Sequence, residues 1–168
     1  MREADRVVDR FADRLKRGGI LIASIHSAPW IDALEKQLPK RLPPSFSSLV
    51  KRYAYVPFEW GPLHFFGNSA TGDEQDFPAI VLRDRLLWST MLNSGFVQFA
   101  QPAGVNHDAI CFDMRASQRN REFPIVRLDH ESILIKQRIK ICGEIAPSFF
   151  ALVETFVEGG SEPIADES

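Results

Sequence analysis

The stretch from Phe96 to Ile135 constrains the fold of this chain more than any other, because it holds most of the strand signal in the sequence. Its apolar residues fall into four short runs, and the first three alternate as half-buried strands do. The runs are Phe96 to Ala100, Ala109 to Asp113, Pro124 to Asp129 and Glu131 to Ile135. The first two connections span eight and about ten residues, which is too short for a helical crossover between parallel strands. The sequence therefore predicts an antiparallel meander.

Helices are predicted on both sides of this meander. Apolar residues recur at the spacing of amphipathic helices in residues 1–17, 29–38, 44–53, 84–92 and 147–158. Helices first, strands next and a closing helix is the order of an α+β domain. We therefore expect an α+β fold with a central, mainly antiparallel sheet, helices packed on one face, N-terminal helices and a closing C-terminal helix. The domain should span residues 1–160, and the acidic residues 161–168 should form a disordered tail.

Composition limits the classes of function. The chain has 168 residues, 45% of them hydrophobic, which is enough for a core without disulfides. Its formal net charge of -2 favours neither a nucleic-acid binder nor a membrane-surface protein. We expect no secretion signal, because the charged N-terminus lacks an apolar h-region, and no apolar run in the sequence is long enough to span a bilayer. With only Cys111 and Cys142, and no Cys/His cluster at zinc spacing, we expect a cytoplasmic protein with reduced thiols and no cofactor or metal.

Several short motifs occur in a fixed order along most of the chain. They are Trp30-x3-Leu34-Glu35, Leu42-Pro43-x2-Phe46, Gly61-Pro62-Leu63-x-Phe65-Phe66, Cys111-Phe112-Asp113, the run from Phe123 to Glu131, and Ile145-Ala146-Pro147-Ser148-Phe149. This ordered set resembles the SUKH superfamily, which groups bacterial immunity proteins with the fungal regulator of cell-wall glucan synthesis. The family-like core would be residues 27–158, with residues 1–26 as an N-terminal extension whose role the resemblance leaves open.

The resemblance implies an α+β fold and a bacterial cytoplasmic protein without enzymatic activity. Such a protein binds a polymorphic toxin, often a nuclease, and neutralises it by occlusion. A scaffold or regulator of cell-wall or cell-envelope synthesis is the alternative that the fungal relative suggests. We expect a protein partner, no direct contact with nucleic acid or membrane, and a monomer or weak homodimer.

Two aspartates and two Asp/His pairs could carry chemistry. Asp113 and Asp129 stand at strand ends, where a carboxylate either accepts backbone N–H bonds or faces a partner. The pairs His107-Asp108 and Asp129-His130 would suit a hydrolase, because a carboxylate can orient a histidine base. Neighbouring residues on an extended chain point to opposite faces, so neither pair is a catalytic dyad by itself. This enzyme reading is therefore a minor alternative.

Cys111 is predicted to be a core residue and not a nucleophile, since it stands between Ile110 and Phe112.

Charged loops give the remaining candidates for partner binding. Arg115, Arg119 and Arg121 lie in one loop, which would suit an acidic partner. Asp73, Glu74 and Asp76 lie in another, which would steer a basic nuclease site. The sequence does not choose between these loops. Trp60, beside the turn Gly61-Pro62, is a candidate interface anchor.

Overall fold

The computed structural model describes residues 2–69, 76–83, 85–116 and 120–165. Its helices are α1 (Glu3–Arg17), α2 (Pro29–Glu35), α3 (Pro44–Arg52), α4 (Phe77–Arg83), α5 (Arg85–Asn93), α6 (His130–Lys136) and α7 (Phe149–Glu158). Its strands are β1 (Ile22–Ser24), β2 (Tyr53–Tyr55), β3 (Phe58–Trp60), β4 (Leu63–Phe65), β5 (Phe96–Pro102), β6 (Ala109–Asp113), β7 (Ile125–Leu128), β8 (Ile141–Ala146) and β9 (Ile164–Ala165). In this part of the chain, no helix is long and apolar enough to cross a membrane.

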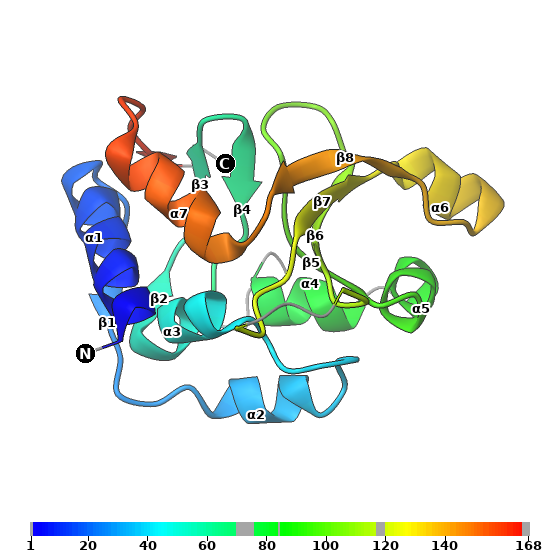
Figure 1. The fold of residues 1–168 in the computed structure, drawn as a ribbon, viewed down its shortest axis with the longest axis horizontal. Helices are drawn as coiled ribbons and strands as arrows, with labels where there is room; N and C mark the ends of the chain where they lie inside the picture. The colour runs from blue at the N-terminus through cyan, green and yellow to red at the C-terminus, as the bar shows by residue number, and fades with distance from the viewer. Residues whose placement is uncertain (1, 70–75, 84, 117–119, 166–168) are drawn as a thin grey trace.

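The main sheet has seven strands in the order β8-β7-β6-β5-β4-β3-β9, and neighbouring strands run antiparallel (Figure 1). Strands β1 and β2 form a separate antiparallel pair. These findings confirm the α+β class and the predicted meander for β5, β6 and β7.

The prediction of a fourth strand, from Glu131 to Ile135, is wrong. Residues 130–136 form helix α6, in which Ser132 and Ile133 are buried while Leu134 and Ile135 are exposed. Two buried neighbours followed by two exposed neighbours fit helical periodicity and not the period of a strand. The strand beside β7 is β8, which the sequence analysis missed. Its first five residues are exposed, and two register shifts against β7 break its alternation, so β8 lacks the usual strand signal.

Both faces of the sheet are covered by helices. On one face, Phe99 and Phe112 pack with Phe46 of α3 and Phe149 of α7, with ring centroids 4.3 to 6.2 Å apart. On the other face a smaller cluster contains Met91 of α5 and Ile133 of α6 with side chains of β5, β6 and β7. The prediction of helices on one face did not include this second layer.

The two chain ends belong to the packed part of the molecule. Phe11 of α1 stacks on Trp60 with ring centroids 5.0 Å apart, so residues 1–26 contribute directly to the core. Residues 161–165, expected in a disordered tail, are held in place. Ser161 Oγ accepts a hydrogen bond from Trp60 Nε1 at 3.0 Å, and β9 pairs with β3.

Candidate functional site

Asp113 and Arg115 form a closed ion pair at the end of β6. Asp113 is buried and accepts hydrogen bonds from the backbone N–H of Arg115 at 3.1 Å and from its guanidinium at 2.9 and 2.8 Å. The side-chain bonds from Arg115, more than its charge alone, lower the pKa of Asp113. The same guanidinium lies over the ring of Phe96 at 4.5 Å. Asp113 therefore accepts a backbone N–H bond from the following loop, which is the structural role expected of an aspartate at a strand end. The guanidinium of Arg115 is paired with Asp113 of the same chain.

Asp129 lies between β7 and α6, at the N-cap of the helix. Its Oδ2 accepts a hydrogen bond from Ser132 Oγ at 2.5 Å and lies 4.0 Å from Lys140 Nζ. The bond from Ser132 is the main cause of its lowered pKa. This contact ties the first turn of α6 to the end of the strand.

Trp60 is not a surface anchor, because its side chain is 0% exposed. Its ring stacks between Phe11 and Phe156, with centroids 5.0 and 5.1 Å away. A turn beside an aromatic residue suggested an interface, but the neighbouring helices α1 and α7 bury it.

Of the three acidic residues predicted to bind a partner, the structure describes Asp76, and this residue is buried. Asp76 is 2% exposed, at the start of α4, and its Oδ2 accepts a hydrogen bond from Ser69 Oγ at 3.3 Å. Asp73 and Glu74 lie outside the described residues, as does Arg119 of the arginine loop. Arg121, in contrast, is exposed and lines a pocket beside α1 and α3.

The two Asp/His pairs, which the sequence left apart, converge at one site. Asp108 Oδ1 lies 2.9 Å from His130 Nδ1 and accepts the backbone N–H of His130 at 3.1 Å. Asp108 Oδ2 accepts a hydrogen bond from Arg127 Nε at 2.6 Å. The ring of His107 lies 5.9 Å from that of His130. We call Asp108, Arg127, Asp129 and His130 the polar cluster.

Strand register builds the polar cluster. Ala109 is opposite Leu128 in the β6–β7 ladder, so one further step brings Asp108 to Asp129 and the start of α6. A prediction of which residues of β6 and β7 lie opposite one another would therefore have located this site. Arg127, which sequence reasoning did not assign to this site, lies in β7, two residues before Asp129.

Electrostatics make Asp108 a stable anion. Burial alone would raise its pKa, but hydrogen bonds from the side chain and backbone of His130 and from Arg127 overcome that effect and lower the pKa to about 2. When Nδ1 of His130 donates to Asp108, Nε2 is the acceptor, which is the tautomer of a general base. The His130 side chain is 30% exposed, so solvent reaches this residue.

The polar cluster also contains the atoms that could hold a metal ion. Ligand atoms of Asp108, Asp129 and His130 lie within 4.8 Å of one another. Both oxygens of Asp108 already accept hydrogen bonds, however, and a cation would meet the positive charge of Arg127. The arrangement suits an ion-pair network that anchors α6 better than it suits a metal centre.

Beyond this network, α6 and β8 lie at one end of the sheet (Figure 1), and both carry exposed apolar side chains. Leu134 and Ile135 of α6 are 58% and 76% exposed, and Ile141 and Ile145 of β8 are 42% and 38% exposed. We call these four residues the α6–β8 surface. β8 is an edge strand, and its second residue, Cys142, is exposed. Four exposed aliphatic side chains on two elements joined by a short connection are a candidate binding surface.

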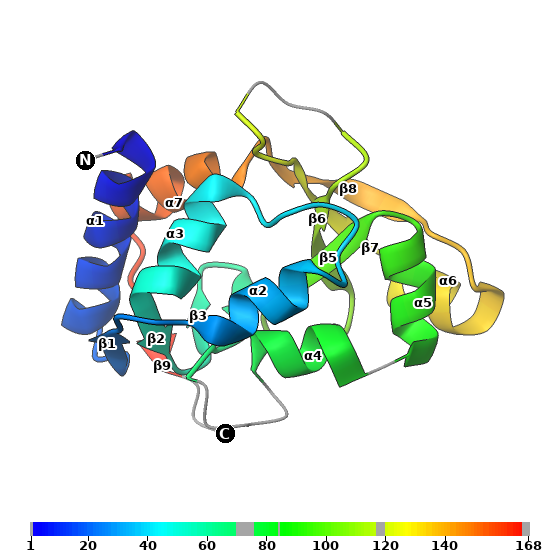
Figure 2. The ribbon, with the colours of Figure 1, turned by 90° about the horizontal axis from the view of Figure 1, so that it is seen from below.

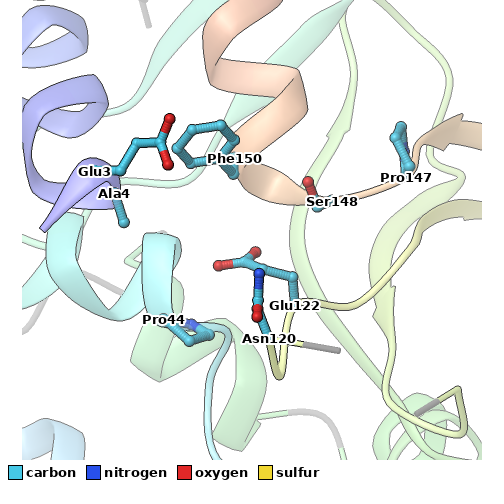
Figure 3. A pocket seen from close by; sticks show the side chains of 8 residues that line it. All are labelled: Glu3, Ala4, Pro44, Asn120, Glu122, Pro147, Ser148 and Phe150. Atoms are coloured by element: carbon cyan, nitrogen blue, oxygen red, sulfur yellow. The ribbon is translucent and has the colours of Figure 1, made fainter. Parts of the chain in front are cut away.

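A pocket of about 360 Å³ lies where α1, α3 and α7 begin (Figure 3). Glu122 reaches into it and accepts hydrogen bonds from the backbone N–H and the hydroxyl of Ser45, both at 2.8 Å. Burial raises the pKa of Glu122, against the opposing effect of these bonds. Glu122 thus caps α3 from within the chain, and its carboxylate fills the place that an external anion would take.

Cys111 is buried in the second core cluster, and burial raises the pKa of its thiol, as expected for a core residue.

A scan of protein-family models and a search of curated proteins found no match to this chain.

Proposed function

We propose that this chain is a binding protein of the SUKH immunity type, which neutralises a bacterial toxin, such as a nuclease, by covering it. The observation that carries the proposal is the α6–β8 surface. Leu134 and Ile135 stand on a short helix whose first residue is bonded to Asp108, and Ile141 and Ile145 lie on the edge strand β8. Exposed apolar side chains of this kind are candidates for the core of a protein interface.

The motifs that resemble SUKH proteins support the fold that this proposal assumes. Phe46, Phe112 and Phe149, three residues of the quoted motifs, pack against one another in the main core. Glu35 of the first motif accepts the backbone N–H of Leu42 at 3.1 Å and so holds the second motif. The motif residues therefore serve packing, while the α6–β8 surface lies largely outside them and is free to differ between family members with different partners.

Side-chain contact is the expected mode of binding. An uncovered edge strand invites addition of a foreign strand, and β8 carries two features that oppose this: two bulges, and the charged residue Glu144. We therefore expect a partner to dock on the aliphatic side chains and not to extend the sheet.

Capture from the native cells, identification by mass spectrometry and calorimetric titration would test the function. A single partner with a toxic domain, bound tightly and inhibited by binding, is the expected result. Several weak partners from cell-envelope synthesis would favour the scaffold alternative instead.

The surface is tested with the captured partner and the double variant Ile135→Asp/Ile141→Asp. Binding should weaken at least about thirtyfold, since two buried contacts become charged. Ile164→Asp is the matched control, because Ile164 is 63% exposed on β9, at the opposite edge of the sheet. Equal loss in both variants, or in neither, would contradict this location.

A second candidate function is a hydrolase that uses the Asp108–His130 pair, favoured by the 2.9 Å contact between them. Incubation of the pure protein with nucleic acid and divalent metals should give no turnover under the immunity proposal. Turnover that disappears in His130→Gln and persists in His107→Gln would establish the enzyme instead.

A further inference from the structure

A second pocket, of about 420 Å³, is lined by residues of α1 and α3. Figure 1 shows these two helices on the side of the molecule away from α6. The pocket is lined by segments far apart in the sequence, from the start of α1, the connection between α2 and α3, the exposed face of α3 and the end of the β6–β7 connection. Each segment contributes positive charge, namely Arg2, Arg41, Lys51, Arg52 and Arg121. We call this the basic pocket. Figure 2 shows that α1 and α3 begin at the same side of the molecule.

The carboxylates of the basic pocket are already engaged. Asp5 accepts a hydrogen bond from Ser48 Oγ at 2.7 Å and lies 3.9 Å from Arg52. Arg52 itself pairs with Asp9 at 2.6 Å. Glu35 is occupied by the backbone of Leu42 at 3.1 Å.

The other four cations of the basic pocket form no ion pair with a carboxylate within the described ranges. They are Arg2, Arg41, Lys51 and Arg121, and all four are exposed. These four cations surround one pocket whose carboxylates are already engaged, which leaves the pocket with an excess of positive charge.

The backbone fixes one of these cations in an unfavourable conformation. Arg121 has φ of 62°, the left-handed region that residues with a Cβ seldom adopt. The next residue, Glu122, is bonded to Ser45 at 2.8 Å and so locks this turn against the start of α3. The backbone of Arg121 is thereby held beside α3.

We propose that the basic pocket binds a phosphate-bearing small molecule. Three arginines supply planar, multidentate donors that match phosphate oxygens, and Lys51 adds a mobile ammonium group. The volume of about 420 Å³ is that of a small-molecule site and is too confined for a folded partner. The site is separate from the α6–β8 surface, so it adds a ligand to the proposed protein-binding function without depending on it.

Inorganic pyrophosphate is the probe for this site, titrated into the full chain by isothermal calorimetry at low salt. We expect saturable binding of one pyrophosphate per chain, and weaker binding as salt rises. Arg41→Ala/Lys51→Ala removes two exposed cations of the pocket and should weaken binding at least about tenfold, the effect of losing charge-assisted hydrogen bonds. Circular dichroism and thermal unfolding check that this variant folds.

Lys136→Ala/Arg138→Ala is the matched control, because it removes two exposed cations at the α6 end and leaves the pocket intact. Its affinity for pyrophosphate should stay within about twofold of the unmodified protein. Equal weakening in the two double variants, or no saturable binding, would overturn the proposal. Citrate that binds as tightly as pyrophosphate at the same ionic strength would overturn the preference for phosphate.

Discussion

The two ends of the main sheet are built in opposite ways. At the β3 end, Trp60 is 0% exposed and stacks between Phe11 and Phe156, and the short strand β9 closes the edge. At the β8 end, the edge strand is uncovered and Ile135 is 76% exposed. At the β3 end Trp60 is fully covered by α1 and α7, whereas at the β8 end four apolar side chains of α6 and β8 are exposed. Stability and binding therefore belong to different regions of the same sheet.

The two ends also differ in what fixes them. Aromatic stacking holds the β3 end, whereas the polar cluster holds α6 at the β8 end, through the contacts of Asp108 with His130 and Arg127. A hydrogen-bonded network fixes a helix geometrically without covering its outer face. This explains how the β8 end can be ordered and exposed at once.

The largest effect is expected at the β3 end. Trp60→Ala would leave a cavity between Phe11 and Phe156 and lower the free energy of unfolding by about 3–5 kcal/mol. Trp60→Phe keeps an aromatic ring and loses the hydrogen bond to Ser161, so its loss should be clearly smaller. Urea unfolding measures both. Similar losses in the two variants would show that the stack is not what stabilises this end.

The polar cluster is the next strongest element, and its effect depends on pH. The pKa of Asp108 falls from 3.8 to about 2 on folding, so its charged form stabilises the folded chain by about 2 kcal/mol above pH 4. This contribution is lost as pH falls from about 4 to about 2. Asp108→Asn should remove it at neutral pH and flatten the dependence of the unfolding free energy on pH in that window. An unchanged acid limb in Asp108→Asn would show that Asp108 does not anchor α6.

The sequence predicted the centre of the sheet better than either end, for a physical reason. Val97, Phe99, Ile110 and Phe112 are buried, so burial imposes the alternation that reveals a strand. Ile141 and Ile145 are exposed, and the register shifts in β8 remove alternation altogether. The apolar run from Ile133 to Ile135 then suggested a strand where the chain forms α6.

Functional residues were partly predictable. The residues of the polar cluster were visible as His107-Asp108 and Asp129-His130, but their convergence required the β6–β7 register, which a single sequence does not supply. The basic pocket joins residues 2, 41, 51 and 121, and no sequence spacing relates them. Trp60 shows the opposite error, since local turn chemistry says nothing about which helices cover a residue.

The start of α7 gives a smaller effect within the packed region. Ser148 Oγ accepts the backbone N–H of Ala151 at 3.0 Å and caps this helix. Ser148→Ala should lower the free energy of unfolding by about 1 kcal/mol, and Ser148→Asp, which can still cap, should restore most of it. Denaturant midpoints compare the two variants. Equal losses would mean that packing of Phe149, and not the cap, determines the stability of α7.

The smallest effect on stability is expected where the effect on binding should be largest. Ile135→Asp replaces a side chain that is 76% exposed, so it should change the free energy of unfolding by less than about 0.5 kcal/mol. Urea unfolding of this variant, compared with Ile164→Asp on β9, measures the difference between the two sheet edges. A loss of several kcal/mol in Ile135→Asp would show that α6 buries Ile135 in solution, and the contrast between a packed end and a binding end would then fail. An unchanged stability, together with a weakened partner complex, would separate the two roles at the level of a single side chain.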